Sequence, residues 1–117
     1  MGEPAAIMVI DDLDERRELM AETLRAAGYA PAAMVRHGVQ ASYAMKELLP
    51  DVIVVALGEP LARSILAVEF AHTLNPDMAV IGYTSDDSPA TLRRAIQAGV
   101  SDILPWPLSE GDLVQSL

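Results

Sequence analysis

The side chains that could do chemistry in this chain stand where short apolar runs end. Asp11 and Asp12 follow AAIMVI, Thr84 follows MAVIGY, and Trp106 comes shortly after DIL. Paired carboxylates are hard oxygen ligands of the kind that a divalent cation takes in proteins. The most apolar run, VIVVAL, has Ala56 near its end, and a methyl group cannot form a covalent bond to a substrate. These residues raise the question of whether the chain has a reactive centre at all.

Other reactive groups are scarce. The chain contains no cysteine, which excludes disulfides, thiolate catalysis and cysteine-type zinc sites. Besides carboxylates, the candidate metal ligands are His37 and His72, which stand far apart and are interpreted as surface or helix-packing residues. Because no nucleophile–base pair or complete metal site is apparent, we predict no enzymatic activity and no cofactor.

Length and charge limit the classes of function. A chain of 117 residues is expected to form one domain with one core. Its formal charge of −9 repels phosphate backbones and anionic lipid, so we expect protein partners and no direct binding of nucleic acid or membrane. The amino terminus lacks the features of a signal peptide and no apolar run is long enough to span a bilayer, which indicates a cytoplasmic protein.

Five strands, each followed by a helix, are predicted from the spacing of apolar residues. The strands cover residues 5–10, 29–35, 52–57, 78–83 and 102–104. The helices cover residues 14–28, 38–49, 61–74 and 88–99, and a fifth, short helix begins at Ser109. Because that helix is short, we expect residues 1–117 to be a single domain cut from the N-terminal part of a longer protein.

This alternation of strands and helices predicts an α/β fold. For a chain of this size the expected form is a flavodoxin-like, doubly wound, five-stranded parallel sheet in the order 2-1-3-4-5, with helices on both faces. Pro31 places the second strand at an edge. Ligands of such sheets bind at the carboxyl ends of the strands, where Asp11, Asp12, Ala56 and Thr84 would lie.

The helix sequences also predict caps and packing faces. Ser88 is expected to cap the fourth helix, with Pro89 at its first position. The broad apolar strip of residues 61–74 has two interpretations. It is either a partner interface, or an ordinary helix whose alanines add apolar residues without forming an adhesive surface. In the first and second helices the expected packing residues are Leu19, Leu24, Ala27, Val39, Tyr43 and Leu48.

Taken in order, these motifs resemble a response-regulator receiver domain, the phosphorylatable half of two-component signalling. The resemblance runs from Ile7 to Leu113 and is carried by the acidic pair Asp11-Asp12, PDVIVVALGEP, VIGYTS and GVSDILPWP. In that family the acidic pair helps to hold Mg²⁺, and an aspartate at the end of the third strand accepts a phosphoryl group. A strand-4 Thr or Ser bonds to the phosphoryl oxygens, and a lysine before a proline neutralises their charge.

Only part of that set is present. Asp11, Asp12 and Thr84 match the family, whereas Ala56 stands at the phosphoacceptor position and Trp106 at the lysine position. The remaining matched positions are Pro107, whose preceding peptide is cis in the family, Ser85 after the threonine, and Ile103 at the aromatic switch position. The loss of both the carboxylate and the fixed cation predicts a degenerate site, because neither the aspartyl phosphate nor its charge compensation is available.

The roles of the remaining residues have alternatives. Asp11 and Asp12 are either a vestigial metal site, with weak binding of Mg²⁺, or caps of the first helix, which the incomplete ligand set favours. Thr84 is expected to serve as a turn or cap hydroxyl. Glu59 lies either in the solvated loop, which is favoured, or in the emptied pocket as a permanent negative charge. Trp106 either fills that pocket or points outward as an interaction anchor.

We therefore predict an atypical receiver domain that acts in signal transduction by phosphorylation-independent protein–protein interaction or dimerisation. The expected partners are a histidine kinase, an output domain in the same chain, or a second copy of the chain. One alternative is a small-ligand sensor that uses the remodelled pocket. Another is an ordinary phosphoreceiver with an engineered aspartate-to-alanine change at position 56, against which Trp106 argues.

Overall fold

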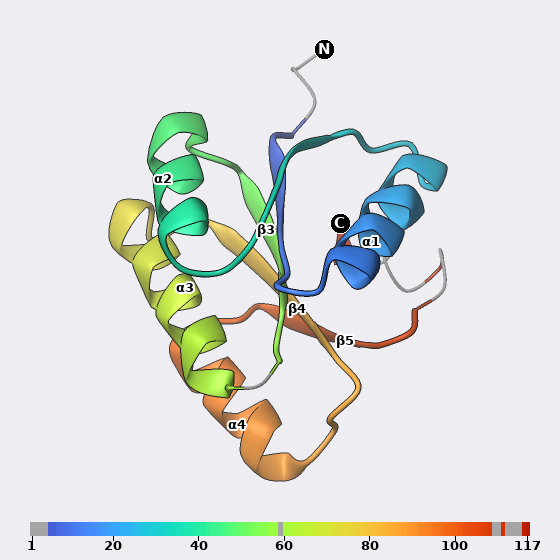
Figure 1. Ribbon diagram of the computed structural model, residues 1–117. Helices are drawn as coiled ribbons and strands as arrows, with labels where there is room; N and C mark the ends of the chain where they lie inside the picture. Colours follow the sequence, from blue (N-terminus) through green and yellow to red (C-terminus); the bar gives the residue numbers. More distant parts are fainter. Residues whose placement is uncertain (1–4, 59, 109–110, 112–115) are drawn as a thin grey trace.

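The computed structural model describes residues 5–58, 60–108, 111 and 116–117, and it has a central sheet between two layers of helices (Figure 1). The sheet has five parallel strands in the order β2-β1-β3-β4-β5, which confirms the predicted topology. The strands are β1 (Ile7–Ile10), β2 (Pro31–Val35), β3 (Val52–Ala56), β4 (Ala79–Thr84) and β5 (Asp102–Pro105).

The helices cover both faces of this sheet. They are α1 (Asp14–Ala26), α2 (Val39–Leu48), α3 (Leu61–Leu74) and α4 (Pro89–Ala98). Figure 1 shows α2, α3 and α4 together on one face and α1 on the other. Two apolar clusters correspond to these faces: Met20 and Leu24 of α1 belong to one, and Met45 of α2 and Val68 of α3 belong to the other.

The carboxyl ends of the neighbouring strands β1 and β3 lie side by side at one edge of the sheet. All of β1 is buried, and so is β3 from Ile53 to Ala56, as expected for strands covered on both faces. In the parallel register Ile10 pairs with Val55, and Ala56 pairs with Tyr83 of β4. The backbone after β1 therefore emerges beside Ala56, with β4 on the other side of it.

Local signals at the ends of α4 act as predicted. The Ser88 side chain accepts a hydrogen bond from the Thr91 backbone N at 3.4 Å, and Pro89 occupies the first helical position. Gly99 ends the helix with φ +111°, a left-handed conformation that favours glycine. The bounds of the other elements differ by at most two residues from those expected: α3 agrees at both ends, and β1 begins at Ile7 rather than Ala5.

The predicted packing faces of α1 and α2 were partly wrong. In α1 Leu24 is buried as expected, but Leu19 is exposed and Met20 and Ala21 are buried in its place. In α2 the buried residues are Ala41 and Met45, whereas the exposed ones are Val39 (88% of its surface), Tyr43 (67%) and Leu48. A small and a flexible side chain let α2 lie close to the sheet, which turns its bulkier residues toward solvent.

The apolar strip of α3 is mostly core. Ala67, Val68 and Ala71 are buried, and Leu66 is the large apolar residue of this helix that is exposed, at 66% of its surface. Two predictions lie outside the described residues: the fifth helix from Ser109 and the position of Glu59. Within the described residues, no helix combines the length and the apolar character that crossing a bilayer demands.

Candidate functional site

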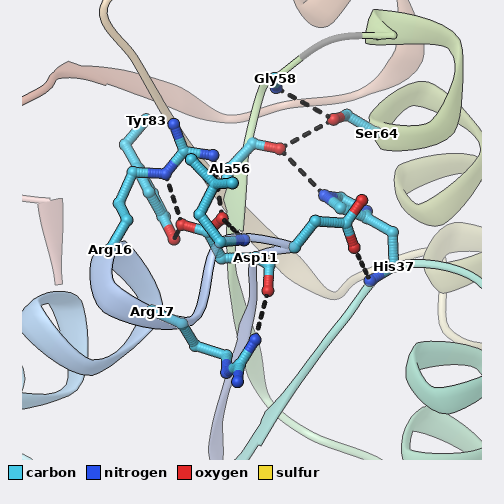
Figure 2. Close-up of polar contacts among 10 residues, drawn as sticks. Asp11, Arg16, Arg17, His37, Ala56, Gly58, Ser64 and Tyr83 are labelled. Carbon is cyan, nitrogen blue, oxygen red and sulfur yellow. Dashed lines mark hydrogen bonds and ion pairs between the residues drawn. The ribbon is translucent and has the colours of Figure 1, made fainter.

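Asp11 is fully buried at the end of β1, and its carboxylate is surrounded by donors (Figure 2). Oδ1 accepts hydrogen bonds from the Leu13 backbone N at 2.9 Å and from Arg16 Nη2 at 2.9 Å. Oδ2 accepts from Arg16 Nε at 2.6 Å and from the Tyr83 hydroxyl at 2.7 Å. A carboxylate offers about four lone-pair sites, so these donors use the capacity of Asp11 completely.

Arg16 supplies the cation of this site. It lies in the first turns of α1 and places its guanidinium on Asp11 in a two-point contact, the strongest geometry for such a pair. Hydrogen bonding to Asp11 raises the pKa of Arg16 above its ordinary value. The guanidinium carbon also lies 5.9 Å from the centre of the Tyr83 ring, within cation–π range.

This arrangement does not fit the Mg²⁺ that the family resemblance implies. Mg²⁺ requires free oxygen ligands at short distances, and here the oxygens of Asp11 already accept from Arg16, Tyr83 and the backbone. The described residues also contain no group of three histidine, aspartate or glutamate side chains that could hold a metal ion. The Arg16 guanidinium already neutralises the carboxylate that would have to bind a divalent cation.

Asp12 faces a different set of donors. Its Oδ1 accepts from the His37 backbone N at 2.9 Å, and its Oδ2 pairs with Arg63 Nη1 at 3.0 Å. The interpretation of Asp11 and Asp12 as caps of the first helix holds only in part: the N-cap residue is Leu13, whose side chain makes no cap bond, and of the two acids Asp11 accepts from the Leu13 backbone N. Asp12 instead joins the end of β1 to the loop before α2 and to α3, whereas Asp11 joins it to α1 and to β4.

Ala56 is buried at the end of β3, and its backbone carbonyl is the group that its neighbours contact. Ser64 Oγ donates to this oxygen at 2.8 Å, and His37 Nε2 lies 3.2 Å from it. Ser64 Oγ also accepts from the Gly58 backbone N at 3.3 Å, which ties the turn after β3 to α3. The strand end thus presents a methyl group and a carbonyl that already has two partners (Figure 2).

Tyr83 and Trp106 form the apolar wall beside Asp11. The Tyr83 ring is buried, and burial raises the pKa of its hydroxyl, which therefore stays a donor. The Trp106 ring lies 5.4 Å from it, centre to centre, at an interplanar angle of 40°, and packs with the same core cluster. Trp106 is half-buried: it packs against Tyr83 and keeps part of its surface in solvent. The Trp106–Pro107 peptide is cis.

The other matched positions take local roles. Thr84 is buried, and its hydroxyl accepts from the Asp86 backbone N at 2.9 Å, which is the turn role predicted for it. Ile103 lies in β5 opposite Gly82 and is partly buried. A hollow lies between the turns after β3 and β4, and it is lined by Thr84, Ser85 and Arg16, among others. Among its described lining residues, Arg16 is the basic one.

His37 is interpreted from the sequence as a surface or helix-packing residue, but in the structure it belongs to the site. It is buried, and within the described residues its Nδ1 has no hydrogen-bond partner. Because the Ala56 carbonyl only accepts, Nε2 carries the ring proton and Nδ1 is a bare acceptor. Burial lowers the pKa of His37 below its ordinary value of 6.5, although Asp12 acts in the opposite direction.

We expect this histidine to make stability depend on pH. As the pH falls through 6.5, the unfolded chain binds a proton at His37 that the folded chain does not, so the free energy of unfolding decreases. The slope in that window should reach at most about 1.4 kcal/mol per pH unit. Urea unfolding between pH 7.5 and 5 would measure it.

Two variants isolate the contribution of His37. In His37→Gln the amide can still donate to the Ala56 carbonyl but does not titrate, so the decrease below pH 6.5 should flatten. His72→Gln is the matched control, since His72 lies away from the site, with Nε2 3.0 Å from the Met78 carbonyl. An unchanged slope in His37→Gln, or a flattened slope in His72→Gln, would contradict the assignment.

The structure therefore brings together Asp11, Asp12, Ala56 and Thr84, as their places at strand ends predict. It adds residues that sequence reasoning missed: Arg16, His37, Arg63, Ser64 and Tyr83. Arg16 had a detectable signal, because a basic residue in the first turns of a helix opposes the helix dipole and needs another reason to be there. Tyr83 had none, because it ends an apolar run like any core residue.

Comparison with known proteins matches this chain to a protein family. The model of the response regulator receiver domain matches residues 7–117. The chemotaxis protein CheY of Thermotoga maritima is 25% identical over 111 residues, which is 95% of this chain and 92% of CheY. A two-component response regulator of the LuxR family from Aurantimonas sp. SI85-9A1 is 26% identical with a TM-score of 0.84, covering 97% of this chain and 81% of that chain. The receiver domain of NarL from Mycobacterium tuberculosis, 22% identical, has the same fold, with a TM-score of 0.85 over 98% of this chain and 94% of that one.

Proposed function

The chain belongs to the response-regulator receiver family, and we propose that it is an atypical member that does not form an aspartyl phosphate at the end of β3. The observation that carries this proposal is the Arg16–Asp11 pair beside Ala56. The strand end has no carboxylate to act as nucleophile, and the neighbouring acid is saturated by a side-chain cation. Asp11, Asp12 and Thr84 are then structural remnants of the phosphorylation site.

We further propose that this domain signals through protein–protein contacts that do not depend on phosphorylation. Receiver domains as a family are signalling modules, and we expect this one to have no catalytic activity of its own. The exposed apolar residues of α2 and α3, including Val39, Tyr43 and Leu66, support a role in contacts. The proposed partners are a histidine kinase, an output domain in the same chain, or a second copy, in the cytoplasm.

Incubation with acetyl phosphate and Mg²⁺ tests the first part of the proposal. We expect the intact mass to remain that of the unmodified chain, because the methyl group of Ala56 cannot accept a phosphoryl group. A receiver domain with a complete site, treated in parallel, controls for the reagents. A stoichiometric gain of one acid-labile phosphoryl group by the wild-type chain would refute the proposal.

The variant Ala56→Asp separates a degenerate site from an ordinary receiver with one altered residue. If only the acceptor were missing, restoring the carboxylate would restore phosphorylation. We expect no rapid phosphorylation, because Arg16 still occupies Asp11 and Trp106 supplies no cation at the lysine position. Rapid phosphorylation of Ala56→Asp would instead identify an ordinary phosphoreceiver that carries an aspartate-to-alanine change.

A further inference from the structure

A hollow of about 510 Å³ lies between α4, β5 and the loop after β4; we call it the α4–β5 hollow. Sites for small molecules in proteins commonly have volumes of about 300–1,000 Å³. The hollow shares Thr84 and Trp106 with the edge of the candidate site but is lined mainly by residues that the Asp11 network does not use. Its lining therefore needs an explanation of its own.

Apolar side chains from two elements face this hollow. Leu92 and Ile96 are four residues apart on α4 and so share one face of the helix, and Ile103 of β5 lies across from them. Trp106 also lines the hollow, with its ring packed on Tyr83. Ile96 keeps 63% of its surface exposed, although it is large and apolar. An apolar body that entered the hollow would remove this surface from water.

The charged residues that line the hollow are acids. Among the described residues these are Asp87, in the loop after β4, and Asp102, at the start of β5. One oxygen of Asp102 accepts from the Ile103 backbone N at 2.9 Å, and the other accepts from the Ser116 hydroxyl. No basic side chain is among the described lining residues, and the whole chain has a formal charge of −9. The local and the overall field therefore both favour a cation.

We propose that the α4–β5 hollow binds a small molecule with an apolar, flat or chain-like body and one positive charge, such as an aromatic or aliphatic amine. Its body lies between Leu92, Ile96 and Ile103, and its ammonium group faces Asp102 at the start of β5, whereas Asp87 lies at the opposite end of the hollow. This site does not depend on the function proposed above, because none of these residues takes part in the Arg16–Asp11 pair.

The fluorescence of Trp106 gives a direct test, because it is the single tryptophan of the chain. The probes are 4-phenylbutylamine, the neutral 4-phenylbutanol and the anionic 4-phenylbutyrate, which share a phenyl group on a four-carbon chain and differ in charge. We expect the amine to change the Trp106 fluorescence saturably. The neutral alcohol and the anionic acid should bind with affinities lower by about fivefold or more. Shifts of backbone amide resonances should map the amine to α4 and β5.

Variants locate the site. Ile96→Lys places a cation on an exposed position at the rim, and Asp102→Asn removes one acid, so both should weaken binding of the amine. Glu47→Gln on α2 removes an exposed acid far from the hollow and should leave binding unchanged. Equal affinity for the three probes, an unchanged titration in Ile96→Lys, or the absence of saturable binding would each overturn the proposal.

Discussion

Replacing Arg16 with alanine is expected to lower the free energy of unfolding by about 3–5 kcal/mol, the usual cost of removing one partner from a buried ion pair. Asp11 is completely buried and receives two hydrogen bonds from the guanidinium, at 2.6 and 2.9 Å. Without Arg16 the carboxylate keeps Tyr83 and the Leu13 backbone N but loses its counter-charge. The uncompensated buried charge, and not the loss of one contact, accounts for the size of this effect.

A surface pair provides the matched control for this measurement. Arg25 lies on the same helix and pairs with Glu18 at 3.5 Å, but the two side chains are 51% and 54% exposed. Arg25→Ala should cost no more than about 0.5–1 kcal/mol in the same urea titration. If Arg16→Ala costs no more than Arg25→Ala, the Arg16–Asp11 pair does not hold the site together.

A double-mutant cycle separates the charge from the loss of packing. Asp11→Asn removes the negative charge but keeps a side chain of almost the same shape. In the Arg16→Ala background this second change should cost less than it does in the wild type, because no buried carboxylate remains to be neutralised. Additive costs would show that the two side chains act independently.

The permanence of Arg16 has a consequence for signalling. A bound Mg²⁺ dissociates and a phosphoryl group is removed, whereas a guanidinium stays protonated and attached to α1 at every physiological pH. If the site is neutralised in this way, as we propose, neither metal nor phosphate would switch it. Regulation through this domain would then depend on which partner binds it or on the ligand proposed for the α4–β5 hollow.

The fold could be predicted from the sequence because its signals are local. Short apolar runs marked each strand, and Ser88, Pro89 and Gly99 marked the ends of α4. The faces of α1 and α2 were predicted less well, because large side chains such as Val39 and Tyr43 were taken as core residues, whereas the small Ala41 is the one that is buried. Burial in α2 depends on how closely the helix approaches the sheet, which is a property of the packed structure.

The candidate site was only partly predictable. Its acids and its missing nucleophile could be placed because parallel strands end at one edge of the sheet. The partners of those acids were harder to predict, because several come from other elements: His37 lies in the loop after β2, Arg63 lies on α3 and Tyr83 lies on β4. Contacts across such distances in sequence leave no periodic pattern.

Replacing Tyr83 with phenylalanine is expected to lower the free energy of unfolding by about 1.5–3 kcal/mol, the range for a hydrogen bond to a charged group. The Tyr83 hydroxyl donates to Asp11 Oδ2 at 2.7 Å inside the core, and phenylalanine keeps the ring and its contact with Trp106. The variant therefore leaves one site of a buried carboxylate without a donor. Tyr43→Phe on α2 is the matched control, since that ring is 67% exposed and should change stability by less than about 0.5 kcal/mol. Equal stability of the two variants would mean that the hydroxyl of Tyr83 contributes nothing to holding Asp11, and that Arg16 alone neutralises the site.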